Sequence, residues 1–256
     1  MEDCRLFIMG AGPGDPELLT LKAFKVLKKA EVVLYDNLSN KKLLSIAPKA
    51  CKMIYVGKKP YENCTPQEEI NELIVKYAKM YNVVVRLKGG DPFIFGRGFE
   101  ELLYAERHGI KSQYIPGISS MQGSGFIDVP LTHRGISESV WIITGTKKDG
   151  SLSKDLAYAM KTSATVVIYM GMKKLQEISE AYKLASLGAT PAAIIQHATL
   201  QNQRQGTCEV KDIQQMALKE GLAYPAIIII GDVVKAREIV SAQQQVEQNM
   251  EILYSA

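Results

Sequence analysis

Residues 85–98 read VRLKGGDPFIFGRG, and this stretch predicts both a fold class and a binding site. An apolar run, Val83–Leu87, has the length of a buried strand and leads into a turn with two adjacent glycines, Gly89 and Gly90. Because glycine has no Cβ, the main chain of such a turn can approach a ligand closely. Open α/β sheets bind small molecules at the carboxyl ends of their strands. The stretch therefore predicts a strand that ends at a ligand site rather than in an ordinary loop.

The composition is that of a globular protein. The 256 residues are 46% hydrophobic and 23% charged, which allows a large core in two domains or in one large domain. A net charge of +4 is too small to favour a nucleic-acid partner, although a local basic cluster can still bind an acidic small molecule. The apolar stretch in the first ten residues is too short for a signal peptide, and the longest apolar run, Ala226–Ile230, is too short to span a bilayer. We therefore expect a cytoplasmic protein with no nucleic-acid or membrane partner.

The cysteines and histidines predict neither disulfides nor a metal centre. Cys4, Cys51, Cys64 and Cys208 are scattered and form no Cys-x-x-Cys pair, which is typical of reduced thiols in a cytosolic protein. The three histidines lie far apart, without the spacing of metal ligands. We expect no bound metal.

Apolar runs of strand length alternate with helical patterns, which predicts an α/β fold with a mostly parallel sheet. Strands are predicted at 5–9, 31–35, 83–87, 140–144, 165–169, 192–196 and 226–230. Thr20 is a good N-cap for a first helix, and Thr65 is a good N-cap for a second helix with Pro66 at its first position.

The segment 113–117 reads as the join between two halves. We therefore expect an N-terminal α/β domain over residues 1–113 and a C-terminal α/β domain over residues 117–240. The Gln-rich residues 241–256 are expected to form a surface helix or a frayed tail.

A second glycine-rich loop, GAGPGDP at 10–16, follows the first predicted strand. It partly matches the dinucleotide-binding fingerprint, in which glycines let the main chain approach a pyrophosphate. The third glycine of that fingerprint is missing, Pro13 would stiffen the loop, and Asp36 lies a few positions too late to bind a ribose. The loop is equally compatible with a nucleotide-like ligand and with a tight structural turn.

Charged residues at predicted strand ends have two interpretations each. Asp36 either caps the turn after the second strand or acts as a general base that faces a ligand. Lys58 and Lys59 are either ordinary surface lysines or cations of the site.

His133 and Arg134 either belong to a solvated loop or line a pocket for carboxylates together with Arg97 and Lys58. Arginine suits such a pocket because its planar fork donates paired hydrogen bonds. Met170, at the end of a predicted strand, either packs in the core or touches an apolar part of a ligand.

Taken together, these segments make the chain similar to the tetrapyrrole methylases. The most specific stretch is RLKGGDPFIFGRG, typical of the members that methylate uroporphyrinogen III. The matching stretches run in order from residue 10 to about residue 207 and cover most of the chain: GAGPGDPELLTLKA, VVLYDNL, VGKK, PQEEIN, VVRLKGGDPFIFGRG, PGISS, VPLTHRGI, TGT, VIYMG and QNQRQGT.

This resemblance implies two α/β domains with S-adenosylmethionine in the cleft between them, and a homodimer. It implies methylation of uroporphyrinogen III at C2 and C7 to give precorrin-2, a precursor of sirohaem and cobalamin, with no need for a metal or a covalent intermediate. Three alternatives stay open: a methylase of a later corrin intermediate, a nicotinamide-dependent oxidoreductase, and a non-catalytic binding protein of the same fold.

The resemblance also assigns roles to individual residues by motif match. Asp36 matches the family's proton acceptor and Lys58 its proton donor. Because the substrate carries many carboxylates, a cationic rim of Arg97, Lys59, His133 and Arg134 is expected to hold it. The cofactor contacts implied by the match are Pro13, Gly89, Gly90, Asp91, Ile94, Ser119, Ser120, Met170, Ala198 and Thr199.

Overall fold

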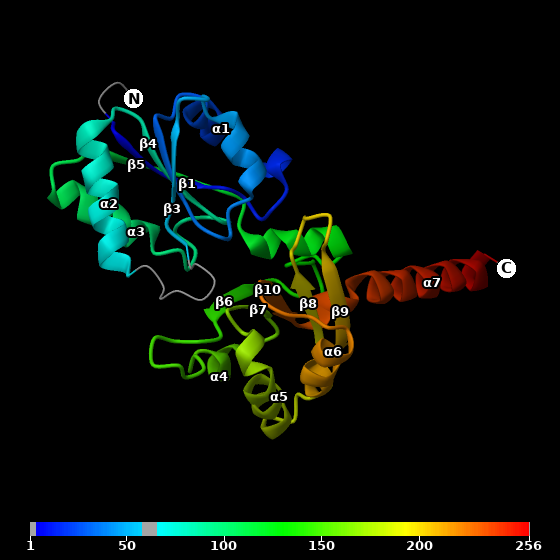
Figure 1. The fold of residues 1–256 in the computed structure, drawn as a ribbon. Helices are drawn as coiled ribbons and strands as arrows, with labels where there is room; N and C mark the ends of the chain where they lie inside the picture. The colour runs from blue at the N-terminus through cyan, green and yellow to red at the C-terminus, as the bar shows by residue number, and fades with distance from the viewer. Residues whose placement is uncertain (1–3, 58–65, 256) are drawn as a thin grey trace. The chain divides into compact units, whose positions relative to one another are not determined.

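A computed structural model describes residues 4–57 and 66–255, with side chains described as far as residue 245. The chain divides into two compact units, Met1–Gln122 and Gly123–Ala256, and each is built around one five-stranded sheet (Figure 1). The predicted α/β class is confirmed. Whether residues 1–113 and 117–240 fold as separate domains stays a prediction.

The first unit holds a fully parallel sheet in the order β3-β2-β4-β1-β5. Its strands are β1 (Leu6–Gly10), β2 (Val32–Tyr35), β3 (Lys52–Tyr55), β4 (Val84–Lys88) and β5 (Ser112–Ile115). Every residue of β1 and β4 is buried, which is typical of central parallel strands covered on both faces.

Helices cover both faces of this sheet because strand side chains alternate between the faces. One core cluster joins Phe7 and Met9 to α1 (Leu21–Leu27), and the other joins Leu6 and Ile8 to α2 (Gln67–Met80) and α3 (Gly98–Arg107) (Figure 1). Short 3₁₀ turns complete the unit: η1 (Pro16–Leu18), η2 (Lys41–Ile46) and η3 (Ser120–Ile127), the last of which runs on into the second unit.

The predicted helix starts are correct to within one residue. Thr20 caps α1, since its Oγ1 accepts a hydrogen bond from the N–H of Ala23 at 3.2 Å. Pro66 is the N-cap of α2 rather than its first residue, and Thr65 lies outside the described residues. Gly109 follows α3 with a φ of 77°, the left-handed conformation in which glycine commonly ends a helix.

The second unit holds a mixed sheet in the order β6-β7-β10-β8-β9. Its strands are β6 (Val140–Thr144), β7 (Thr165–Tyr169), β8 (Pro191–Gln196), β9 (Arg204–Glu209) and β10 (Ala226–Ile230). Only β6 and β7 are paired in parallel, whereas β10 is antiparallel to both of its neighbours and β9 is antiparallel to β8. The connection from β8 to β9, residues 197–203, is too short for the crossover that a parallel pair needs.

Helices α5 (Leu175–Leu184) and α6 (Ile213–Lys219) pack their apolar faces on the second sheet (Figure 1). The remaining elements are α4 (Leu156–Ala159), η4 (Met172–Lys174), η5 (Val210–Asp212), η6 (Asp232–Lys235) and α7 (Ala236–Ser255). The Gln-rich end of the chain is thus a continuation of α7 as far as Ser255. None of the helices in the described part of the chain combines the length and the apolar composition of a transmembrane span.

Candidate functional site

Three segments of the first unit meet at the carboxyl ends of β1, β4 and β5. Gly10 ends β1, Gly90 follows β4, and Gly117 follows β5. A Cβ added to Gly10 would lie 2.5 Å from the Cα of Gly117 and 2.6 Å from the carbonyl oxygen of Gly90, distances that real side chains do not adopt. The three main chains therefore pack directly against one another, and this contact requires glycine.

Hydrogen bonds join the two glycine-rich loops of the sequence into one structure. The N–H of Gly90 donates to the carbonyl oxygen of Gly12 at 2.7 Å, and the N–H of Gly12 donates back to the carbonyl oxygen of Gly90 at 3.3 Å. Gly12 and Gly90 have φ values of 77° and 65°, in the left-handed region that favours glycine. The loop that contains Pro13 and the turn at residues 89–92, called here the glycine turn, therefore form a single surface.

The carboxylate of Asp91 fixes the glycine turn from within. Its Oδ1 accepts a hydrogen bond from the N–H of Phe93 at 2.8 Å. Its Oδ2 accepts one from the hydroxyl of Tyr114 at 2.6 Å and one from the N–H of Gly117 at 3.1 Å. Asp91 is buried, and both of its oxygens already have protein donors. Its side chain therefore anchors the turn to β5 and to the segment that leads to Ser119 and Ser120.

The residues after the glycine turn adopt strained conformations. Phe95 and Arg97 have φ values of 53° and 57°, which cost an ordinary L-residue about 1–2 kcal/mol each. Such strain is concentrated at functional sites in proteins. The guanidinium of Arg97 forms a two-pronged ion pair with Glu100, with 2.6 Å between Nη2 and Oε2, and both side chains are half-exposed. Ile94, which lies in the sequence between the glycine turn and Phe95, is half-buried.

Asp36 follows β2 and is both a turn cap and an ion-pair partner. Its Oδ1 accepts hydrogen bonds from the N–H of Leu38 at 3.1 Å and from the hydroxyl of Ser39 at 3.4 Å. Its Oδ2 lies 3.0 Å from Nη2 of Arg86. The side chain is 21% exposed, so the carboxylate is held in one orientation and still reaches the surface.

Behind Asp36 lies a buried group of charges that sequence analysis did not predict as a group. Arg86 and Lys88 both contact Oε1 of Glu101, at 3.3 Å and 3.0 Å, and Glu101 is fully buried. Burial lowers the pKa of Lys88, and the neighbouring charge of Arg86 lowers it further. We call Asp36, Arg86, Lys88 and Glu101 the charged cluster. Arg86 and Lys88 lie inside a strand that is predicted to be buried, and buried cations need buried acidic partners. The sequence therefore indicated that such a partner exists, but not which residue it is.

In the second unit, predicted site residues follow the ends of β7 and β8. Met170 has a φ of 55° and is exposed. His197 and Thr199 have φ values of 52° and 69°, whereas Ala198 between them is buried without a positive φ. The N–H of Thr199 donates to the side-chain oxygen of Gln203 at 2.7 Å, which stabilises this turn. Both strand ends therefore carry the strained, non-glycine conformations also found after the glycine turn.

The predicted cationic rim is described only in part. Lys58, the predicted proton donor, and Lys59 lie outside the described residues. His133 sits in a tight loop in which it exchanges backbone hydrogen bonds with Ser137, and Arg134 beside it is exposed. Because Arg97 belongs to the first unit and His133 and Arg134 to the second, the common rim stays a prediction.

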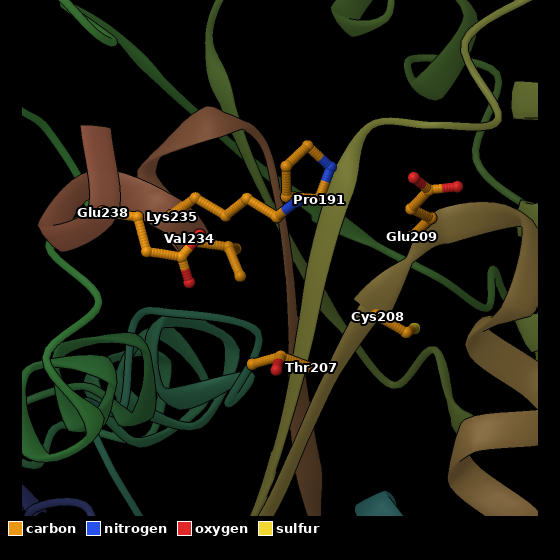
Figure 2. A pocket seen from close by; sticks show the side chains of 7 residues that line it. All are labelled: Pro191, Thr207, Cys208, Glu209, Val234, Lys235 and Glu238. Atoms are coloured by element: carbon orange, nitrogen blue, oxygen red, sulfur yellow. The ribbon is translucent and has the colours of Figure 1, made fainter. Parts of the chain in front are cut away.

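A cavity of about 210 Å³ in the second unit lies elsewhere. Its lining includes Thr207, Cys208 and Glu209 of β9, Lys235 at the end of η6 and Glu238 in the first turn of α7 (Figure 2). It also includes Pro191, the first residue of β8, so it lies at the other end of that strand from Ala198. Burial raises the pKa of Cys208 to about 11, which makes this thiol unreactive near neutral pH. No predicted site residue lines this cavity.

Among the residues that the structure describes, no three histidines, cysteines, aspartates or glutamates are grouped in a way that would hold a metal ion. The two glycine loops of the first unit carry more of the predicted site residues than any other described region: Pro13, Gly89, Gly90 and Asp91. Asp36, Ser119 and Ser120 belong to the same unit, and their contact with a ligand stays a prediction.

Comparison with known proteins identifies the relatives of this chain. A uroporphyrinogen-III C-methyltransferase of Bacillus subtilis is 42% identical over 233 residues, which cover 90% of this chain and 91% of that protein. A siroheme synthase of Thiobacillus denitrificans is also 42% identical, over 91% of this chain but only 49% of the larger protein. The chain thus spans about half the length of the siroheme synthases that it matches.

A solved structure gives the same result for the fold. The uroporphyrin-III C-methyl transferase of Thermus thermophilus, crystallised with S-adenyl homocysteine, superimposes with a TM-score of 0.77 at 38% sequence identity. The match covers 91% of this chain and 99% of that chain. The family model for tetrapyrrole (corrin/porphyrin) methylases matches residues 5–214, and the resemblance inferred from the motifs is confirmed. This chain belongs to the tetrapyrrole methylases.

Proposed function

We propose that this protein transfers methyl groups from S-adenosylmethionine to C2 and C7 of uroporphyrinogen III and so produces precorrin-2. The activity named for the Bacillus subtilis relative, with which the match covers nearly the whole of both proteins, supports this proposal. So does the complex of the Thermus thermophilus protein with S-adenyl homocysteine, the demethylated form of the donor. The observation that carries the proposal is the glycine turn with RLKGGDPFIFGRG around it, built into one surface with the loop at 10–16.

The residues of the first unit fit this donor. The segments 10–13, 89–94 and 117–120 carry the predicted contacts Pro13, Gly89, Gly90, Asp91, Ile94, Ser119 and Ser120. Hydrogen bonds from Gly12 to Gly90 and from Gly117 to Asp91 join all three segments, so one ligand can touch them together. When bound, S-adenosylmethionine supplies a methyl group on a positively charged sulfur. Met170, Ala198 and Thr199 of the second unit stay predicted contacts.

The protein's main contribution is alignment of the two reactants. Holding two groups in a reactive geometry can lower the barrier by about 7–11 kcal/mol without any covalent step by the enzyme. The glycine turn suits this task because its main chain is fixed at several points, by Gly12 on one side and by the carboxylate of Asp91 on the other. A rigid turn keeps its polar groups in place when a ligand binds.

Asp36 is positioned to take up the proton that the macrocycle loses after methylation. Leu38, Ser39 and Arg86 orient its carboxylate, and the exposed part of the side chain can reach a substrate at the surface. A positioned base of this kind contributes a rate factor of about 10²–10⁴. Lys58 stays the predicted proton donor.

Arginine and lysine side chains would hold the carboxylates of the substrate. Arg97 already shares Nε and Nη2 with Glu100, and its fork can still donate to a substrate carboxylate through Nη1. Lys59, His133 and Arg134 stay the other predicted members of this rim. The expected result is electrostatic steering of a polyanion, which weakens as salt is added.

Two measurements test the proposal. Calorimetry should show that S-adenosylhomocysteine binds the purified protein at micromolar concentration or below and that NADH does not bind. Incubation with uroporphyrinogen III and S-adenosylmethionine should give a product that is heavier by two methyl groups in mass spectrometry. Binding of NADH in place of S-adenosylhomocysteine would indicate an oxidoreductase, and methylation of a later corrin intermediate alone would indicate another branch of the family.

We also infer a homodimer in the cytoplasm, without nucleic-acid or membrane partners, as the family resemblance and the composition imply. Light scattering coupled to size-exclusion chromatography tests the dimer, since it gives the mass in solution independently of shape. A mass near that of one chain, 28.3 kDa, would contradict it.

A further inference from the structure

The geometry points to Tyr114 as a positioning residue of the S-adenosylmethionine site, acting through Asp91. This inference rests on the proposed function, because it assumes that the glycine turn binds the donor. Tyr114 lies on β5 and was not among the predicted site residues. It is assigned here because its hydroxyl is the one side-chain donor among the three described partners of the Asp91 carboxylate, the other two being main-chain N–H groups.

Asp91 links two of the segments that are proposed to bind S-adenosylmethionine. Through Oδ1 it holds the residues that follow the turn, and through Oδ2 it holds Gly117, two residues before Ser119. Tyr114 contacts the same Oδ2 at 2.6 Å, a length typical of a strong hydrogen bond to a charged acceptor. Loss of this bond would leave Asp91 with main-chain donors only, and the two segments would be less firmly linked.

The ring of Tyr114 is held in place by the turn that its hydroxyl supports. Phe93 stacks on it with 4.0 Å between ring centres and 18° between ring planes. The main-chain N–H of Phe93 is itself bound to Asp91, so Asp91, Phe93 and Tyr114 form a closed group. On the other side, the backbone of Tyr114 is fixed in β5, in register with Ile8 of β1.

The hydroxyl of Tyr114 remains a donor at neutral pH. Burial raises its pKa, and the hydrogen bond to Asp91 raises it further. A neutral hydrogen-bond donor suits this position, because it adds no positive charge to a site proposed to bind a positively charged molecule. The expected role of Tyr114 is therefore to keep the glycine turn in its binding conformation without altering the charge of the site.

The test is the variant Tyr114→Phe, which keeps the ring and its stacking on Phe93 and removes only the hydroxyl. If a smaller fraction of the protein has a binding-competent turn, the apparent dissociation constant rises in proportion. We expect S-adenosylhomocysteine to bind about tenfold more weakly, equivalent to about 1.4 kcal/mol, in calorimetry. The KM for S-adenosylmethionine should rise by a similar factor, and kcat should change less than about twofold.

Tyr77→Phe is the matched control. Tyr77 lies on α2 in the same unit, and no hydrogen bond of its hydroxyl is found among the described residues. This variant should bind S-adenosylhomocysteine as the wild type does. A Tyr114→Phe protein with wild-type affinity would overturn the inference. So would a loss of kcat at unchanged KM, since that result is expected when part of the protein is irreversibly misfolded and the remainder binds normally.

Phe93→Leu is a second variant, which decides the matter if Tyr114→Phe does not fold. It removes the stacking partner of Tyr114 and leaves both hydrogen-bonding groups, so affinity should fall in the same direction but by a smaller factor. Wild-type affinity in Phe93→Leu would then overturn the inference. Failure of the wild type itself to bind S-adenosylhomocysteine would instead refute the proposed function.

Discussion

Two regions at the carboxyl end of β4 use buried carboxylates in different ways. In the charged cluster, two cations share the carboxylate of Glu101, and Arg86 is also paired with Asp36, so that two carboxylates balance two cations. In the glycine turn, Asp91 accepts hydrogen bonds from neutral donors and ties the turn to Tyr114 of β5 and to Gly117. The first arrangement fixes a charge beside the surface, and the second fixes a main-chain conformation. Proton transfer is therefore assigned to the charged cluster, and binding of S-adenosylmethionine is assigned to the glycine turn.

The largest expected effect is on turnover when Asp36 is replaced. Asp36→Asn keeps the cap on Leu38 and removes the base, so kcat should fall about 10²–10⁴-fold while S-adenosylhomocysteine still binds normally. Steady-state kinetics and calorimetry on the same protein check both statements. Asp149→Asn is the control, because Asp149 caps an exposed turn of the second unit in a similar way. Normal turnover in Asp36→Asn would remove the assignment of proton transfer to the cluster.

The next effect is on stability and concerns Glu101. Glu101→Ala leaves Arg86 and Lys88 buried with Asp36 as the remaining carboxylate of the cluster, and loss of one partner from a buried ion pair costs about 3–5 kcal/mol. Urea unfolding measures this loss. Glu100→Ala, on the same helix but exposed, should change the free energy of unfolding by about 0–1 kcal/mol. Equal effects in the two variants would show that the cluster does not stabilise the unit.

Gly117→Ala tests the packing of the segment after β5 against the glycine turn. Its Cβ would overlap the main chains of Gly10 and Gly90, and such overpacking costs about 1–3 kcal/mol. We expect both a lower thermal midpoint and weaker binding of S-adenosylhomocysteine. Gly125→Ala serves as the control, since a Cβ there would meet no atom within 4 Å. A Gly117→Ala protein that binds as tightly as the wild type would show that this packing is not needed for the donor.

The pH dependence of stability distinguishes the cluster from the turn. The pKa of Lys88 is lower in the folded state than its usual value of 10.5. At a pH between the folded-state pKa and 10.5, the unfolded chain therefore binds more protons than the folded chain. The free energy of unfolding contributed by Lys88 therefore rises as the pH rises through this window. Compared with Lys88→Met, the wild type should gain stability in urea unfolding as the pH is raised towards 10.5. A constant difference between the two proteins would contradict the buried position of this charge.

The smallest effect on stability is expected at Arg97. Its ion pair with Glu100 is half-exposed, so Arg97→Gln should change the free energy of unfolding by less than about 1 kcal/mol. The KM for uroporphyrinogen III should nevertheless rise, and its dependence on salt should weaken, because one rim cation is lost. An unchanged KM over a range of salt concentrations would remove Arg97 from the rim.

The central strands and the glycine loops could be predicted from the sequence because each depends on local pattern. Strands β1, β2 and β4 are apolar runs, and Gly12 and Gly90 stand where the backbone needs a left-handed conformation. The strands that were not predicted, β3, β5 and β9, are edge strands in which most residues are exposed or half-exposed. The reversed direction of β10 was also not predicted, because strand direction depends on connections rather than on composition.

The partners of site residues could not be predicted in the same way. Tyr114 lies 23 positions from Asp91 and Glu101 lies 15 from Arg86, and no local pattern links either pair. They meet because β5 follows α3 back to the sheet edge beside β1, and because α3 covers the face of β4 that carries Arg86 and Lys88. Motif matching found the residues proposed to touch ligands, whereas the residues that hold them in place became visible only in the fold.

Hydrogen–deuterium exchange with and without saturating S-adenosylhomocysteine tests most directly whether the glycine turn binds the methyl donor. The expected result is slower exchange in peptides that cover residues 10–14, 88–94 and 117–120, with little change in β9, at the edge of the second sheet. Protection that is absent from all three segments, with the ligand shown to be bound, would contradict the assignment of donor binding to this turn.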